Sequence, residues 1–231
     1  MKILAIIPAR GGSKSIPKKN IKLFCGKPLI SYSIELAIKC SSVDRVIVSS
    51  DSNEIIDISM KYGAEAPFRR PDKLANDDTA DFPVFKHCLD FLKNYEPSLV
   101  VHLRPTSPLR TIEMLEKAIK MMIDNPEADS LRGVCEPTQS PYKMWTIDSN
   151  GFLNPFNKNI SIKEPYNQPR QKLPLVYWQN GYMDVIRLNT LSEKKSMTGN
   201  KIFPLLIKDN NIFDIDDYTT FKMAEEHYKN L

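Results

Sequence analysis

Several features that define other classes of protein are missing from this 231-residue sequence. No apolar run approaches the roughly 20 residues that a membrane-spanning helix requires, so we expect no membrane insertion. The apolar run Ile3–Ile7 is also too short for the core of a signal peptide. The cysteines lack the paired spacing of zinc ligands or of a disulfide framework, and they stand at positions 25, 40, 88 and 135. These absences predict a cytoplasmic protein with reduced thiols.

Common catalytic and nucleic-acid-binding signatures are missing as well. The net charge is only +4 and the basic residues are scattered, so nucleic acid is not an expected partner. There is no Gly-x-Ser-x-Gly segment, and His87, His102 and His227 form no cluster in the sequence. The sequence therefore gives no support to covalent acyl chemistry, and we expect His102 to be a core residue with satisfied hydrogen bonds.

Composition and periodicity predict one α/β domain over residues 1–231. An apolar fraction of 42% and a charged fraction of 26% are typical of a globular protein with a sizeable core. Apolar residues at helical spacing predict helices that begin near Ile30, Ile55, Phe82 and Leu115, and Asp51 or Ser52 is placed to cap the second. Short apolar runs predict buried parallel strands at 3–7, 46–48 and 99–103. This alternation predicts a doubly wound parallel sheet.

Polar loops follow each of the three predicted strands. They are residues 8–20, 49–51 and 104–110. Because ligands bind at the carboxyl ends of the strands in such sheets, we expect these loops to converge on one site. Residues 136–180 differ from the rest, since they are rich in proline, aromatic residues and asparagine. They predict a small irregular or β-rich lobe whose exposed aromatic residues pack on a partner subunit.

The loop after the first strand has the composition of an anion site. It holds Arg10, Gly11, Gly12 and three lysines, so the backbone can approach a phosphate closely while the cations offset its charge. A solvated basic turn is the alternative. The loop is not a Walker A motif, because Ser13 precedes Lys14, and no Gly-x-Gly-x-x-Gly fingerprint occurs.

Two further segments offer cations at the predicted site. Two prolines stiffen residues 104–110 and fix where Arg104 and the hydroxyl groups of Thr106 and Ser107 point. Arg69 and Arg70 precede a proline and form either a solvated turn or a contact with a nucleotide base or phosphate. The sequence does not decide which of these two arginines faces the site.

Two carboxylates near the C-terminus form a candidate metal site. If residues 214–216 are extended, Asp214 and Asp216 point to one face and can meet a single Mg²⁺ ion. Capping of the last predicted helix, near residues 218–228, by Asp216 or Asp217 is the alternative, and different aspartates can fill both roles. Residues 168–174 add Arg170, which is suited to gripping a carboxylate.

Taken together, these segments resemble the acylneuraminate cytidylyltransferase family, whose members make CMP-activated sialic acids and related nonulosonates. The matching segments appear in the family's order and extend over nearly the whole chain. The resemblance implies a Rossmann-like, three-layer α/β/α fold with a mostly parallel sheet and a small protruding dimerisation lobe. The matching segments are residues 7–14, 16–20, 48–51, 69–75, 104–110, 168–171, 180–181 and 214–216.

The resemblance also implies an activity and the residues that serve it. CMP would pass from CTP to the anomeric hydroxyl of a 2-keto-3-deoxy sugar acid, with release of pyrophosphate and no covalent intermediate. The implied catalytic residues are Arg10, Lys19, Asp214 and Asp216, with the two aspartates holding Mg²⁺ or Mn²⁺. The implied nucleotide contacts are Ala9, Arg10, Gly11, Gly12, Ser13, Lys19, Asn20 and Arg70. The implied sugar contacts are Arg104, Thr106, Ser107, Lys143, Arg170 and Gln171, and Lys143 lies in the lobe through which a homodimer is expected.

The chain departs from the family pattern at two positions. Many sialate-specific members have glutamine where this chain has Arg104, which implies a sugar acid other than N-acetylneuraminate. Ser15 stands where many members have glycine, so we expect a slightly different loop conformation there. Other readings are a nucleotidyltransferase that uses another NTP or a sugar 1-phosphate, or a nucleotide-binding module without turnover. A GT-A-like glycosyltransferase is disfavoured, because its carboxylate pair usually lies mid-chain.

Overall fold

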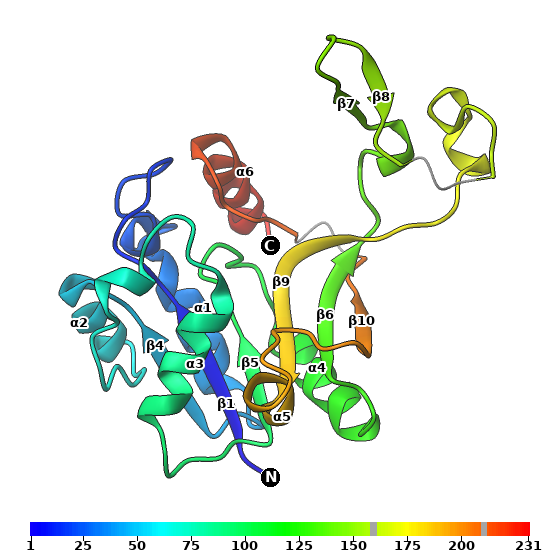
Figure 1. Cartoon of the computed structure of the whole chain (residues 1–231). Coiled ribbons are helices and arrows are strands. Elements are labelled where there is room, and N and C mark those ends of the chain that lie inside the picture. The colour runs from blue at the N-terminus through cyan, green and yellow to red at the C-terminus, as the bar shows by residue number, and fades with distance from the viewer. Residues whose placement is uncertain (158–160, 209–211) are drawn as a thin grey trace.

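A computed structural model describes residues 1–157, 161–208 and 212–231 of the chain (Figure 1). Residues 158–160 of the predicted lobe therefore lie outside the described residues. The described part is built around a six-stranded sheet in which one strand, β9, runs antiparallel to both of its neighbours. The strands in spatial order are β10 (Ile202–Leu206), β6 (Ser130–Cys135), β9 (Trp178–Arg187), β5 (Leu99–His102), β1 (Ile3–Pro8) and β4 (Arg45–Ser49).

Helices cover both faces of this sheet and confirm the predicted three-layer fold. Along β1, Ile3, Ala5 and Ile7 face one apolar cluster, whereas Leu4 and Ile6 face another, as expected for a strand buried on both sides. The first cluster packs against α1 (Leu29–Lys39), α2 (Asn53–Lys61) and α4 (Ile112–Asp124), and the second against α3 (Asp81–Phe91) and α5 (Leu188–Ser192).

A third apolar cluster joins the segments that surround the predicted site. It brings together Ile16 of the first loop, Leu109 of the loop after β5, Ile215, and Phe221 on α6 (Tyr218–Lys229). The short hairpin of β2 (Leu23–Phe24) and β3 (Lys27–Pro28) packs into the same cluster through Phe24. Burial of these side chains fixes three loops that are far apart in the sequence relative to one another.

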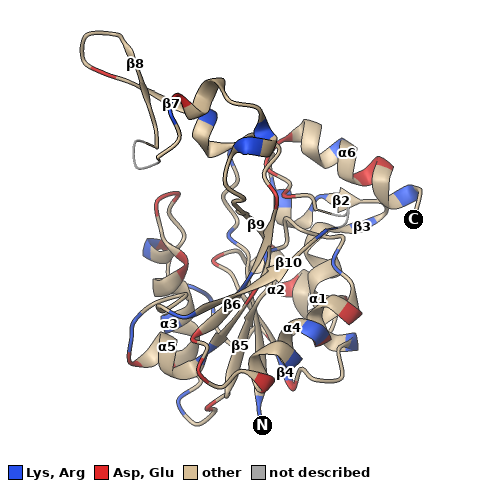
Figure 2. Cartoon of the chain, turned by 90° about the vertical axis from the view of Figure 1, so that its right-hand side faces the viewer, with Lys and Arg blue, Asp and Glu red and all other residues tan. Residues whose placement is uncertain are grey.

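The predicted lobe projects away from the sheet (Figures 1 and 2). A hairpin of β7 (Trp145–Ile147) and β8 (Leu153–Pro155) forms its tip, and three single-turn helices lie in it at Pro141–Lys143, Pro165–Asn167 and Arg170–Lys172. The lobe ends where β9 begins, because Trp178 already pairs with Cys135 of β6. Large apolar side chains are exposed along it, among them Ile147, Phe152 and Leu153.

The helix caps match the predictions in part. Asp217 caps α6 through a reciprocal pair of hydrogen bonds with Thr220, so Asp214 and Asp216 are not needed for that role. At α2, Ser52 occupies the cap position, but its side chain makes no capping hydrogen bond, and the Asp51 carboxylate instead accepts from the backbone N–H of Gly11. The expected side-chain cap at α2 is therefore wrong. Among the described helices, none combines the length and the apolar character needed to cross a bilayer.

Candidate active site

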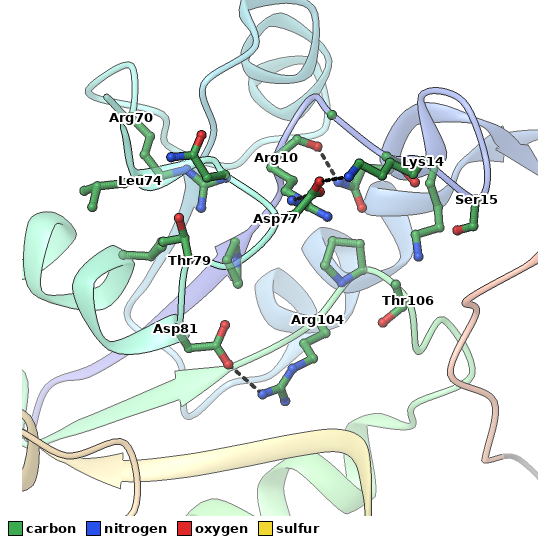
Figure 3. A pocket seen from close by; sticks show the side chains of 18 of the residues that line it. Arg10, Lys14, Ser15, Arg70, Leu74, Asp77, Thr79, Asp81, Arg104 and Thr106 are labelled. Atoms are coloured by element: carbon green, nitrogen blue, oxygen red, sulfur yellow. Dashed lines mark hydrogen bonds and ion pairs between the residues drawn. The ribbon is translucent and has the colours of Figure 1, made fainter. Parts of the chain in front are cut away.

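A cavity of about 480 Å³ lies at the carboxyl ends of β1 and β5 (Figure 3). The loops after β1 and β5 line it, as predicted, whereas residues 49–51 after β4 do not, and cations outnumber acids along its wall. The residues that line it are Pro8, Arg10, Gly12, Ser13, Lys14, Ser15, Lys19, Asn20, Arg70, Leu74, Asn76, Asp77, Thr79, Asp81, Val84, Arg104, Pro105, Thr106 and Asp216.

The first loop supplies three of these cations. Arg10 and Lys14 both pair with Asp77, with 2.6 Å between Arg10 Nη1 and Asp77 Oδ1. Lys19 is held differently, because its Nζ donates to the carbonyl of Ile215 at 2.9 Å and lies 3.8 Å from Asp216 Oδ1. Lys19 therefore links the first loop to the C-terminal carboxylates.

The two glycines of the first loop differ in the space that surrounds them. A Cβ at Gly11 would lie 3.0 Å from Ser52 Cβ, so a side chain there would require Ser52 to shift. A Cβ at Gly12 would meet nothing within 4 Å, which leaves that backbone open to the cavity. Ala9 is buried and its N–H continues the pairing of β1 by donating to Ser49. Ala9 and Gly11 thus use their N–H groups within the chain and do not line the cavity.

Ser15 does not have a positive φ, and the left-handed residue of this loop is Lys18, at φ 53°. The expectation that serine gives the loop a slightly different conformation from glycine stays a prediction. The Ser15 hydroxyl donates to the backbone carbonyl of Asp216, which ties the first loop to the carboxylate segment a second time. Asn20 is buried and donates to the carbonyl of Arg10, which fixes the backbone at that cation.

Of the two consecutive arginines, Arg70 is the one that faces the site. Arg69 is exposed and pairs with Asp72, whereas Arg70 is only 3% exposed and lines the cavity. Its Nη2 lies 3.6 Å from Asp51 Oδ1, and within the described residues its Nε and Nη2 have no hydrogen-bond partner. Burial lowers the pKa of Arg70, and the nearby Asp51 opposes that effect. A buried guanidinium with unused donors can receive oxygen or nitrogen acceptors of a ligand.

Arg104 lies on the opposite wall and is already neutralised. Its guanidinium contacts two carboxylates, with 2.9 Å to Asp81 Oδ2 at the start of α3 and 3.2 Å to Asp184 Oδ2 on β9 (Figure 3). The Arg104 side chain therefore enters the cavity as a fixed donor and not as a free cation.

Asp184 is the middle residue of three charged or titratable side chains that lie in register on the neighbouring strands β5, β9 and β6. It is paired in register with His102 of β5 and with Arg132 of β6, and Arg132 Nε donates to it at 2.7 Å. Burial by itself raises the pKa of the Asp184 carboxyl, but the adjacent His102, Arg132 and Arg104 lower it by more, so that it lies well below its usual range. His102 is fully buried 3.6 Å from Asp184, and neither ring nitrogen has a hydrogen-bond partner among the described residues. His102 is thus a core residue, as expected. Its hydrogen bonds are not satisfied among the described residues, and that part of the expectation is wrong.

Arg110 explains the rigidity of the loop after β5. Its buried guanidinium donates to the carbonyls of Tyr182 and Arg104 and to the hydroxyl of Ser33. Burial lowers its pKa to about 9. Thr106 lines the cavity, whereas Ser107 is buried and donates to the carbonyl of Gly181. The loop is therefore held by hydrogen bonds as well as by its prolines.

Asp214 and Asp216 lie in a segment without regular secondary structure that leads into α6. Ile215 between them is fully buried, and its N–H donates to the carbonyl of Thr106. Asp214 is half-buried and Asp216 is exposed, so burial alternates along these three residues. Burial and repulsion from Asp214 raise the pKa of Asp216. Gly181 makes room beside the pair, because its φ is +67° and a Cβ there would lie 3.1 Å from Asp214 Oδ2.

The predicted sugar contacts of the lobe are not brought to this cavity within one chain. Arg170 donates to the carbonyl of Pro137 and lies 3.8 Å from Glu136, and Gln171 lines a separate depression with it. Lys143 lies in the lobe on a single-turn helix. These three residues remain predictions that require a second subunit.

Three acidic residues of the site were missed by reasoning from the sequence. Asp77 and Asp81 lie in the segment that leads into α3, and Asp184 lies in the middle of β9. The acidic run 77–78 and a charged residue within an apolar strand were the available signals.

Cation-lined cavities at the carboxyl ends of a mostly parallel sheet are typical of α/β proteins that bind a phosphorylated ligand. The comparison with protein families agrees with that class: the family described as Cytidylyltransferase matches residues 4–171. The chain belongs to the cytidylyltransferase family.

Individual relatives point the same way. The chain is 32% identical to a CMP-N,N'-diacetyllegionaminic acid synthase of Legionella pneumophila, over 98% of this chain and 96% of that protein. It is 46% identical over 127 residues to a pseudaminic acid cytidylyltransferase of Campylobacter jejuni, a match that spans 54% of this chain and about half (55%) of that relative. A structure of a CMP:2-keto-3-deoxy-manno-octonic acid synthetase complexed with CTP has a TM-score of 0.71 and 16% identity, and covers 100% of this chain and 99% of that one. This last likeness concerns the fold alone.

Proposed function

We propose that this chain transfers CMP from CTP to the anomeric hydroxyl of a 2-keto-3-deoxy nonulosonate and releases pyrophosphate. The observation that carries the proposal is the cavity itself, which the cations of the first loop line together with the carboxylate of Asp216. The relatives named as synthases and cytidylyltransferases of legionaminic and pseudaminic acid support this class of sugar acid.

The first loop is the proposed triphosphate site. Arg10, Lys14 and Lys19 would contact the phosphate oxygens, and Gly12 leaves open backbone beside them. Arg70 would donate to the base or ribose, because its unused N–H groups are buried at the edge of the same cavity. A nucleotide held in this way leaves the wall around Arg104 and Thr106 to the sugar acid.

Positioning and charge neutralisation would supply the catalysis. The hydroxyl oxygen of the sugar acid attacks the α-phosphorus, and the hydroxyl proton is released to water. The bond between the α-phosphorus and the oxygen that bridges it to the β-phosphate breaks, and its electron pair leaves with pyrophosphate. Lys19 is tethered to Ile215 and to Asp216, so its cation is fixed beside the reacting phosphate without reorganisation. Arg10 offsets charge on the departing phosphates.

Asp214 and Asp216 fit a divalent cation, Mg²⁺ or Mn²⁺. They supply hard oxygen donors, burial and repulsion from Asp214 raise the pKa of Asp216, and Gly181 leaves space beside Asp214. A bound ion would relieve that repulsion and would polarise phosphate oxygens. Magnesium sites commonly combine one or two carboxylates with substrate phosphates and water, so this pair is sufficient on the protein side.

A homodimer would complete the sugar side of the site. Lys143, Arg170 and Gln171 lie in the lobe, which projects from the sheet (Figure 2). The lobe also exposes large apolar side chains. Exposed apolar patches of this kind mark protein interfaces. A partner's lobe reaching toward this cavity would bring the missing cations to the carboxylate of the sugar acid.

Replacement of Asp216 by asparagine tests the proposed chemistry. Asp216→Asn keeps the size of the side chain but removes one charge, and we expect metal-dependent pyrophosphate release to fall at least about 100-fold. The matched control is Asp57→Asn, on an exposed position of α2, which should leave the rate unchanged. Full activity of Asp216→Asn would refute the assignment of this carboxylate.

A further inference from the structure

Asp77 holds two cations of the first loop from across the cavity (Figure 3). One carboxylate oxygen, Oδ1, lies 2.6 Å from Arg10 Nη1, and the other pairs with Lys14 Nζ. These two contacts lower the pKa of Asp77, with the Lys14 contact contributing most. Two oxygens of one anion thus bridge an arginine and a lysine, as two oxygens of a phosphate group do.

The segment that carries Asp77 is tied to the first loop through this side chain. Its own backbone hydrogen bonds are local turns, from Ala75 N–H to Asp72 and from Thr79 N–H to Asn76. Side-chain exposure is 46% for Asp77 and 85% for Lys14, so both ion pairs are open to solvent. Ion pairs of this kind are weak and can be exchanged for a stronger anion without disturbing the core.

We propose that the Asp77 carboxylate competes with the triphosphate group of a nucleotide for Arg10 and Lys14, and thereby sets the affinity of the site. The inference rests on the proposed function, which gives these cations to the triphosphate. A polyphosphate carries more charge than a carboxylate, so it displaces Asp77, and the segment 75–80 is then free to move from the first loop. Asp77 is accordingly an affinity-determining residue, and chemistry does not pass through it.

The same contacts would also allow Asp77 to assist nucleotide binding, and the test must distinguish this role from competition. If Asp77 stays in contact with Arg10 and Lys14 while the nucleotide is bound, it orients them, and its removal weakens binding. If Asp77 competes, its removal strengthens binding. The sign of the change in affinity therefore decides between the two roles.

Calorimetric titration of the full chain with inorganic tripolyphosphate and with CTP, both in EDTA, measures that sign. Asp77→Asn should lower the Kd for both compounds on the order of threefold to tenfold, because two partly exposed ion pairs no longer oppose binding. Asp78→Asn is the matched control: it removes the same charge from the adjacent exposed residue, which forms no ion pair within the described residues. Its Kd should stay within about twofold of the unaltered chain.

Three results would overturn the inference. They are an unchanged or higher Kd for tripolyphosphate in Asp77→Asn, an equal gain of affinity in Asp78→Asn, and an absence of tripolyphosphate binding to every variant. A failure of the proposed function is recognised separately, because the unaltered chain would then release no pyrophosphate from CTP with any sugar acid. Asp77 is exposed, so the variant should fold, and an unchanged Tm would verify it.

Discussion

Replacement of the buried carboxylate of Asp184 by an amide should destabilise the whole domain. Asp184 is 2% exposed and accepts hydrogen bonds from Arg132 Nε at 2.7 Å and from Arg104 Nη1 at 3.2 Å. Asp184→Asn preserves the shape but leaves Arg132 without its anion and Arg104 with Asp81 as its one remaining carboxylate partner among the described residues. Because both arginines are about one-fifth exposed, water relieves part of that cost.

The expected size of the effect follows from those two contacts. Hydrogen bonds to charged groups contribute about 1.5–3 kcal/mol each, and an asparagine retains one acceptor oxygen. We therefore expect the free energy of unfolding to fall by about 2–4 kcal/mol. In a chain of this size, each kcal/mol lowers the Tm by about 2–4 °C, so the Tm should drop by roughly 4–16 °C.

Urea denaturation as a function of pH provides the assay. The pKa of Asp184 is lowered in the folded chain, so its stabilising effect is fully present above the pKa of an unfolded aspartate, about 3.9, and is lost as the pH falls toward the folded pKa. The gap between Asp184→Asn and the unaltered chain should be constant from pH 7 to about pH 5 and shrink below about pH 4. Asp57→Asn should stay within about 0.5 kcal/mol throughout. A stability of Asp184→Asn equal to that of the unaltered chain, or a gap that does not depend on pH, would refute the reasoning.

Two further variants test the site and the lobe. Gly181→Ala places a side chain against Asp214 at a φ of +67°, so pyrophosphate release should fall about tenfold. The control is Gly26→Ala, at φ +90° with nothing within 4 Å of the added Cβ, which should show only the effect of backbone strain. Equal rates of pyrophosphate release in the two variants would contradict the role of Gly181. Ile147→Glu places a charge on a lobe residue that is 73% exposed. Light scattering should then show monomers, and steady-state kinetics should show a raised KM for the sugar acid. Met60→Glu, also exposed, should change neither property, and an unaltered chain that is monomeric would remove the basis of this prediction.

Much of the scaffold could be predicted from local sequence patterns. The apolar runs of β1, β4 and β5 are buried on both faces, and that pattern does not depend on distant residues. The apolar side chain of Ile215 between two aspartates was sufficient to indicate the buried residue of that segment, whereas the shared face of Asp214 and Asp216 stays a prediction. Asp216 and Asp217 were both candidates for the cap of α6, and the structure gives that role to Asp217.

The pairing of the acidic residues could not be predicted in the same way. Asp184 meets Arg104 because β9 is antiparallel to β5, and neither that direction nor its register is written in a short apolar pattern. Asp77 meets Arg10 only because the chain turns back beyond β4. The left-handed conformation of Lys18 was not predicted either, because a lysine in a loop gives no local signal for a positive φ.

Pyrophosphate release is the most direct measure of the proposed transfer of CMP to a nonulosonate in this cavity. The purified chain would be supplied with Mg²⁺ and each of the four NTPs in turn, together with a panel of sugar acids and sugar 1-phosphates. We expect release with CTP and a 2-keto-3-deoxy sugar acid such as a legionaminate or pseudaminate, and its loss in Asp216→Asn. Release with a sugar 1-phosphate or with another NTP in preference to this pair, or binding of CTP without turnover of any sugar acid, would contradict it.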